Sequence, residues 1–232
     1  MTDLHVESTA DATNAPAAPA PVRRPISFRG TRMAAVMAKA LAATEITPNA
    51  ISFAGPVFSF IGCAALGYVP SSTSPGSTAF LLLVGALMIL LRSLCNVFDG
   101  MVAIEHGRQT KSGELFNELP DRFSDFFTMV GAGLVAPANL GLGWIAAALA
   151  IITAYVRALG GAMGAGQHFI GPMQKTHRMA VIAGALVLSA VLALQGHSVR
   201  WVMFAALAIV IVGCLITIFV RARKIIEVAE SR

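Results

Sequence analysis

Six hydrophobic segments separated by short polar connections dominate the chain. They cover residues 51–69, 78–104, 114–136, 142–164, 179–195 and 201–220. A bilayer core about 30 Å thick is crossed by about 20 residues of helix, and most of these segments are long enough. The pattern therefore predicts an all-α fold, a polytopic membrane bundle of six transmembrane helices.

Two segments precede the first hydrophobic stretch. Residues 1–26 are rich in Ala and Pro, a composition typical of disorder. In residues 27–45, apolar side chains recur at helical spacing beside Arg and Lys (Met33, Val36, Met37, Ala40, Leu41). This predicts an interfacial amphipathic helix in the headgroup region, with a soluble helix packed on the protein's own loops as the alternative. The membrane domain then spans 46–225, and residues 226–232 form a cytoplasmic tail.

Composition excludes several classes of protein. Of the 232 residues, 56% are hydrophobic and 12% are charged, whereas soluble domains have about 25% charged residues. The chain has too few charges to coat a soluble globule and is too apolar to be mostly disordered. The formal net charge of +5 could indicate a nucleic-acid partner. The basic residues lie beside hydrophobic segments, however, which indicates membrane topology and phosphate-bearing ligands instead.

The distribution of Lys and Arg predicts the orientation in the membrane. Basic residues precede the first segment, follow the second, fourth and sixth segments, and are almost missing from the other connections, which contain only Arg200. By the positive-inside rule both termini are cytoplasmic. We therefore expect an integral protein of the cell (inner or plasma) membrane.

The second and third segments carry polar residues at helical spacing. Asn96, Asp99 and Ala103 share one face of the second helix, and a second polar face recurs every fourth residue on the third (Gly113, Asn117, Asp121, Asp125). Ionisable groups at membrane depth usually mark functional sites. Carboxylate and amide oxygens suit a hard cation such as Mg²⁺, Mn²⁺ or Ca²⁺. Gly100, Ala103 and Gly113 would let a bulky ligand approach the backbone, or would merely permit close helix packing.

The segment from Asn96 to Asp121 resembles the signature of the CDP-alcohol phosphatidyltransferases. That signature is D-x2-D-G-x2-A-R, a spacer, then G-x3-D-x3-D, and the spacing here is the same throughout. Thr47-Pro48-Asn49 is similar to the family's entry into its membrane domain. The resemblance implies transfer of a phosphatidyl group from a CDP-linked lipid donor to a polar alcohol with release of CMP. CDP-diacylglycerol is the donor that prevails in the family. It also implies Mg²⁺ or Mn²⁺ as cofactor and a homodimer.

Three positions depart from the family pattern. Asn96 and Asn117 stand at the first and third acidic positions, and Ile104 replaces the arginine. The resemblance assigns Asp99 to the metal, and Asp121 to the metal and to general-base catalysis. Asn96 and Asn117 become neutral metal ligands, so we expect weak metal binding. Gly100, Ala103 and Gly113 fall at the nucleotide-binding positions. Asp125 either compensates for the lost charges or pairs with a basic neighbour.

A second polar group follows in the fourth and fifth segments. Arg157 interrupts an apolar helix, and Lys175, His177 and Arg178 open the fifth segment. The resemblance places such residues at donor or acceptor phosphate, where Arg binds oxygens in pairs and Lys acts as a point charge. For the last three, anchoring at the cytoplasmic boundary is an equal alternative. Arg92 receives no role, and Glu118 is expected to be solvated.

Two other functions remain open. The amides at 96 and 117 and the missing arginine are consistent with a catalytically impaired homologue that binds a nucleotide-lipid or a partner membrane protein. A transporter could use Asp99, Asp121 and Arg157 along a permeation path, but the outer halves of the segments offer almost no polar residues. An active transferase is the preferred hypothesis.

Overall fold

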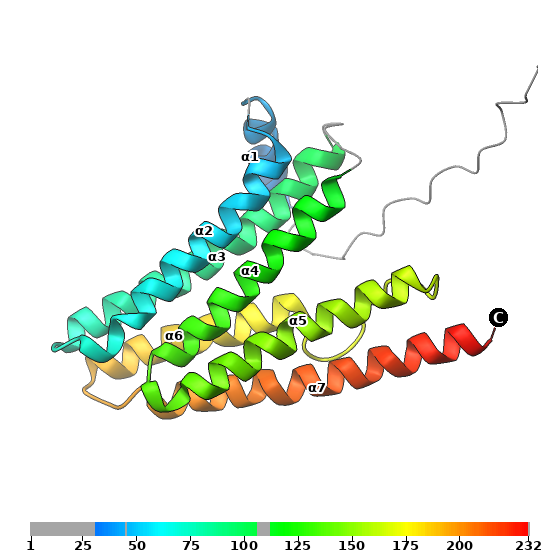
Figure 1. The fold of residues 1–232 in the computed structure, drawn as a ribbon. Helices are drawn as coiled ribbons and strands as arrows, with labels where there is room; N and C mark the ends of the chain where they lie inside the picture. The colour runs from blue at the N-terminus through cyan, green and yellow to red at the C-terminus, as the bar shows by residue number, and fades with distance from the viewer. Residues whose placement is uncertain (1–30, 45, 106–111, 232) are drawn as a thin grey trace, which may run out of the picture.

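The structure, a computed structural model, describes residues 31–44, 46–105 and 112–231, and every regular element within these ranges is helical (Figure 1). The helices are α1 (Arg32–Ala42), α2 (Pro48–Gly67), α3 (Pro75–Glu105), α4 (Gly113–Leu134), α5 (Leu140–Ala162), α6 (Lys175–Leu194) and α7 (Arg200–Glu230), with short 3-10 turns η2 (Val69–Ser71) and η3 (Pro137–Asn139). The predicted all-α class is confirmed. The predicted Ala/Pro tail lies outside the described residues.

Five helices are long and apolar enough to cross a membrane, namely α2, α3, α5, α6 and α7. Helix α4 matches the third predicted segment in position, but acidic and amide side chains in its first half lower its hydropathy. Six spans is therefore an approximate count. The five apolar helices and α4 together make up the bundle.

The long helices pack as two connected groups, α2 with α3 and α4, and α5 with α6 and α7 (Figure 1). Helix α2 packs along α3 and α4, while α3 contacts α6, α4 contacts α5, and α5 contacts α7. The buried core joins these helices through apolar side chains (Leu82, Met129, Ile182, Leu186, Leu207). Large apolar side chains such as Phe60 and Phe219 remain exposed. Exposure of this kind is expected where a helix faces lipid tails instead of water.

Helices α4 and α5 approach each other closely at Gly133 and Gly143. A Cβ atom on Gly143 would lie 2.9 Å from the backbone oxygen of Met129 and 3.0 Å from the Cα of Gly133. The small residues of these two helices thus serve a contact inside one chain.

Helix α1 lies within the predicted juxtamembrane segment. The Thr31 hydroxyl caps its start by accepting a hydrogen bond from the Ala34 amide at 3.2 Å. Ala34 and Ala38 are buried in one apolar cluster with side chains of α3 such as Met101. Met33 and Val36, on the predicted apolar stripe, are 61% and 67% exposed. The helix therefore packs on α3 with its alanine face and leaves its larger apolar side chains available to the membrane.

The connection from α5 to α6, residues 163–174, packs against the middle of α7, at Gly213, Thr217 and Arg221. Gly171 adopts φ +105°, and a Cβ atom there would lie 2.6 Å from the Cγ2 of Thr217. The Thr217 hydroxyl accepts a hydrogen bond from the Met173 amide at 2.9 Å. After this connection, α6 begins at Lys175, which is four residues before the start of the predicted segment. Lys175 and Arg178 therefore lie within a helix.

Candidate functional site

The predicted acidic and amide residues meet where α3 faces α4. The Asn96 Nδ2 donates to both carboxylate oxygens of Asp121, at 3.0 and 3.1 Å, and reaches the Asn117 Oδ1 at 3.5 Å. The amide nitrogen, not the oxygen, faces the carboxylate because only the nitrogen carries hydrogens to donate. The contact that helical spacing predicts between the two polar faces therefore exists.

Asp99 lies on the same side of α3 and is buried, with 4% of its surface exposed. The Ser52 hydroxyl of α2 donates to its Oδ2 at 2.6 Å, and the Gly100 amide lies 2.6 Å from its Oδ1. Ser52 could not be predicted from the sequence, because a single serine in an apolar helix is ordinary. Gly100, Ala103 and Gly113 are all half-buried.

Basic groups from three helices surround Asp121. The Lys175 Nζ, at the start of α6, forms an ion pair with the Asp121 Oδ2. Arg92 Nη2 of α3 lies 3.9 Å from Oδ1, and Arg122 Nη2 of α4 lies 3.8 Å from Oδ2. Burial of Asp121, which is 8% exposed, makes these charges necessary for its ionisation.

Asp125 is fully buried and is held by two arginines. Its Oδ1 lies 2.6 Å from Arg92 Nη2, and its Oδ2 lies 2.9 Å from Arg178 Nη2. Of the two interpretations of Asp125, pairing with basic neighbours is therefore the one found. Arg92, which received no role from the sequence, is one of its partners.

Arg157 joins α5 to α4. Its Nη2 lies 2.7 Å from the Glu118 Oε2, and its Nη1 donates to the Gln167 Oε1. Its guanidinium carbon also lies 5.2 Å from the ring centroid of Phe169. Glu118, which was expected to be solvated, is 35% exposed and also pairs with Arg157 and, at 3.4 Å, with Arg122.

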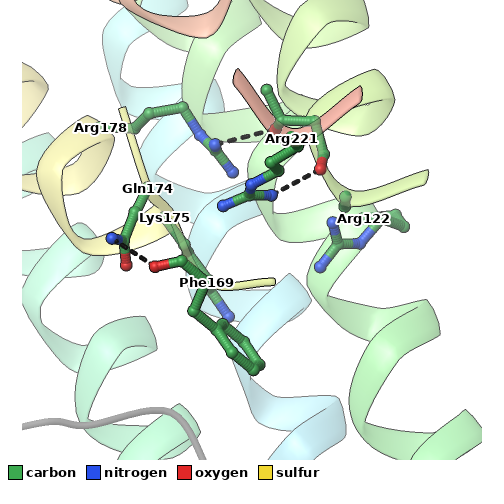
Figure 2. A pocket seen from close by; sticks show the side chains of 8 residues that line it. Arg122, Phe169, Gln174, Lys175, Arg178 and Arg221 are labelled. Atoms are coloured by element: carbon green, nitrogen blue, oxygen red, sulfur yellow. Dashed lines mark hydrogen bonds between the residues drawn. The ribbon is translucent and has the colours of Figure 1, made fainter. Parts of the chain in front are cut away.

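A small basic pocket opens beside Lys175. Four of its lining side chains are cationic, and the others are neutral (Arg122, Lys175, Arg178, Arg221, Thr153, Ala154, Phe169, Gln174). Figure 2 shows the guanidinium groups of Arg122, Arg178 and Arg221 turned toward the same space. Backbone carbonyls orient Arg221, since Nη1 donates to Thr153 at 2.6 Å and Nε donates to Ile170 at 3.0 Å. Such an arrangement can bind the oxygens of phosphate groups.

The sequence identified this pocket only in part. Lys175 and Arg178 line it and are 6% and 3% exposed, so they are not simple boundary anchors, which would be solvated. His177 is exposed, and its Nδ1 lies 2.8 Å from the Pro172 carbonyl. Arg122 and Arg221 were missed. Arg221 has the position of an ordinary residue after a membrane span, and Arg122 differs from other charged neighbours only by following Asp121.

The oxygen donors are of the type that a divalent cation needs, but few of them are charged. Asp99 and Asp121 supply carboxylates, and Asn96 and Asn117 supply amide oxygens. Within the described ranges, no group of three or more His, Cys, Asp or Glu side chains is placed to hold a metal. Mg²⁺ is commonly bound through one or two carboxylates together with substrate phosphates. The residues therefore fit one weakly held cation.

The bundle is thus a membrane-embedded fold whose buried acidic residues adjoin a basic pocket. No protein-family profile matches the sequence, and no curated protein matches it either. The fold is that of phosphatidylinositol phosphate synthase (PgsA1) from Mycobacterium tuberculosis, a CDP-alcohol phosphatidyltransferase. This agrees with the family resemblance of the sequence motif.

Three crystal structures of that synthase resemble this chain. The structure with CDP-DAG bound has a TM-score of 0.64 and 21% identity, covering 84% of this chain and 94% of the synthase. The complex with manganese and citrate has a TM-score of 0.65 and 20% identity, covering 83% and 88%. The apo form has a TM-score of 0.56 and 22% identity, covering 79% and 95%. At this level of identity the comparison establishes the fold.

Proposed function

We propose that the protein is a phosphatidyltransferase that uses a CDP-linked lipid donor, CDP-diacylglycerol, and a polar alcohol acceptor. The observation that carries the proposal is the contact of Lys175 with Asp121. This contact joins the acidic and amide residues of α3 and α4 to the basic pocket. Phosphoryl transfer needs cationic groups that position the substrate phosphates and a base near the attacking hydroxyl. The basic pocket would supply the first and Asp121 the second.

The reaction we propose is displacement at phosphorus. The acceptor hydroxyl attacks the phosphorus atom next to the lipid, the bond from that phosphorus to the CMP oxygen breaks, and Asp121 takes the hydroxyl proton. Asp99, with the amide oxygens of Asn96 and Asn117, would hold Mg²⁺ or Mn²⁺. When bound, the cation would neutralise negative charge on the donor phosphates. Gly100, Ala103 and Gly113 leave room for the nucleotide.

The basic pocket favours an anionic acceptor, namely an alcohol that carries its own phosphate. Four cations line it, and Arg157 and His177 lie at the same end of the bundle. Guanidinium groups bind phosphate oxygens through paired hydrogen bonds. The basic pocket also lies beside Asp121, so a phosphate held there would keep the acceptor hydroxyl near the base.

The test is release of CMP from CDP-diacylglycerol by the purified full-length protein with Mn²⁺ or Mg²⁺. Phosphorylated and neutral polyols serve as separate acceptor panels. Asp121→Asn keeps the shape of the side chain and should lower the rate by about 10²–10⁴-fold. Glu227→Gln is the matched control, since it removes an exposed carboxylate on α7 whose partner is Lys224. CMP release that does not depend on Asp121 would contradict the assigned base.

A second candidate function is binding of a nucleotide-lipid or partner protein without turnover. The amides at 96 and 117, together with the cation on Asp121, favour it because they reduce the negative charge available to a metal. This function would be supported if the wild type released no CMP and the double variant Asn96→Asp/Asn117→Asp did release it. Release by the wild type would exclude it.

We propose that both termini and the site face the cytoplasm. The site side chains come from the C-terminal halves of α3, α5 and α7 and from the N-terminal halves of α4 and α6, as the alternating direction of the helices requires. A homodimer is part of the same proposal. Cysteine labelling from each side of vesicles tests the orientation, and cross-linking in the membrane tests the dimer.

A further inference from the structure

The hydrogen-bond donors on Asp121 and on Asp99 differ in charge. Asp121 takes the Lys175 ammonium and the Asn96 amide, and two guanidinium groups lie within 4.0 Å of it. Asp99 takes a serine hydroxyl and a backbone amide, both neutral. The carboxylate of Asp121 is therefore paired directly with cations of the protein, whereas the groups hydrogen-bonded to Asp99 are neutral, although the charge of Lys175 acts on Asp99 as well.

The wider cluster is rich in positive charge. Three carboxylates, those of Glu118, Asp121 and Asp125, are paired with five cations from four helices (Arg92, Arg122, Arg157, Lys175, Arg178). A divalent cation brought to Asp121 would be repelled by these groups at short distance, in a medium that screens charge poorly.

Lys175 is held in place by the fold. It is the first residue of α6, and its side chain is 5% exposed. Moving a buried ammonium away from its carboxylate leaves two uncompensated charges, which is costly. Lys175 is thus a fixed component of the site, unlike a surface lysine that could swing into water.

We infer that Lys175 supplies at Asp121 the positive charge that a metal ion would otherwise bring, so that the chain binds one divalent cation, at Asp99. The inference rests on the proposed function, because it assigns the charges of that same site. Asp121 then remains ionised and able to accept a proton without being a metal ligand. The arrangement also suits the amides at 96 and 117, since one cation requires fewer carboxylates than two.

The experiment counts Mn²⁺ on the purified full-length protein by the electron paramagnetic resonance signal of the free ion. We expect one Mn²⁺ per wild-type chain and loss of this binding in Asp99→Asn. Lys175→Met removes the ammonium and should either tighten Mn²⁺ binding by about tenfold or add a second ion. Lys175→Arg, which keeps the charge, should behave like the wild type.

Lys224→Met is the matched control, because it removes a lysine whose side chain is 42% exposed and lies outside the pocket. It should leave Mn²⁺ binding unchanged. Two ions on the wild type, or Mn²⁺ binding by Lys175→Met that is unchanged or weaker, would overturn the inference. If Lys175→Met does not fold, Lys175→Gln and the wild-type count decide. The Mn²⁺ count does not require catalysis. A protein that releases no CMP would therefore contradict the proposed function without deciding how many ions it binds.

Discussion

Arg92 and Asp125 form a buried ion pair, 2.6 Å from Nη2 to Oδ1, that joins α3 to α4 inside the bundle. Both side chains are almost fully enclosed, at 1% and 0% exposure. Arg178 reaches the other oxygen of Asp125 from α6 at 2.9 Å. Three helices are therefore tied together at one carboxylate, one helical turn from Asp121.

Asp125→Asn should strongly destabilise the protein. The change keeps the shape of the side chain but leaves Arg92 and Arg178 without their anionic partner, and loss of one member of a buried pair costs about 3–5 kcal/mol. The free energy of unfolding in detergent measures the effect. Glu227→Gln, which breaks the exposed pair with Lys224 at 3.1 Å, should cost less than about 1 kcal/mol. Equal effects of the two variants would contradict a structural role for Asp125.

Asn96→Asp should make stability depend on a divalent cation. The Asn96 amide donates to both oxygens of Asp121, so a carboxylate in its place loses these bonds and faces a like charge. We expect the free energy of unfolding to fall by about 1–3 kcal/mol in EDTA and to recover when Mn²⁺ is added. The wild type in the same two buffers is the control. A variant as stable as the wild type in EDTA would show that the contact contributes little.

Much of the fold could be predicted because membrane helices are encoded by local composition. The segment 142–164 matches α5, Leu140–Ala162, to within two residues. The meeting of Asn96 with Asp121 also followed from helical spacing, because Asn96 and Asp99 share one face of α3 and Asn117 and Asp121 share one face of α4. The start of α6 was missed by four residues, because Lys175 and Arg178 look like solvated boundary residues until the 163–174 connection and Asp125 provide their partners.

The basic pocket could be predicted only in part, because its residues come from distant parts of the chain. Arg122 on α4 and Arg221 on α7 are 99 positions apart in sequence yet line one pocket. Nothing in the local pattern around Arg221 separates it from the other basic residues near the C-terminus. Pairing between helices, as for Glu118 with Arg157, likewise depends on packing that spacing along one helix does not contain.

Gly143→Ala should destabilise the bundle at the contact between α4 and α5. Its Cβ atom would lie 2.9 Å from a backbone oxygen, and backbone cannot move aside as a flexible side chain can, so we expect a cost of about 1–3 kcal/mol. Gly184→Ala is the matched control in α6, where a Cβ atom would meet nothing within 4 Å. It should stabilise the helix by up to about 1 kcal/mol. Thermal unfolding in detergent should shift in opposite directions for the two variants.

Arg122→Gln should weaken binding of a phosphorylated acceptor more than it affects the chemical step. Arg122 lines the basic pocket. Its distances to Glu118, Asp121 and Asp125 are 3.4, 3.8 and 3.9 Å, so each of its ion pairs is looser than the 2.6 Å pair of Arg92 with Asp125. A hydrogen bond to a charged group contributes about 1.5–3 kcal/mol, which predicts a KM for the acceptor raised by about 10–100-fold.

The measurement is CMP release at varied acceptor concentration, with kcat and KM determined separately. Arg223→Gln is the control, because Arg223 is exposed, lies over the Phe219 ring at 5.8 Å and does not line the pocket. Its KM should equal that of the wild type. A fall in kcat with an unchanged KM in Arg122→Gln would instead place Arg122 at the reacting phosphate, where its charge acts on the transition state and not on the bound acceptor.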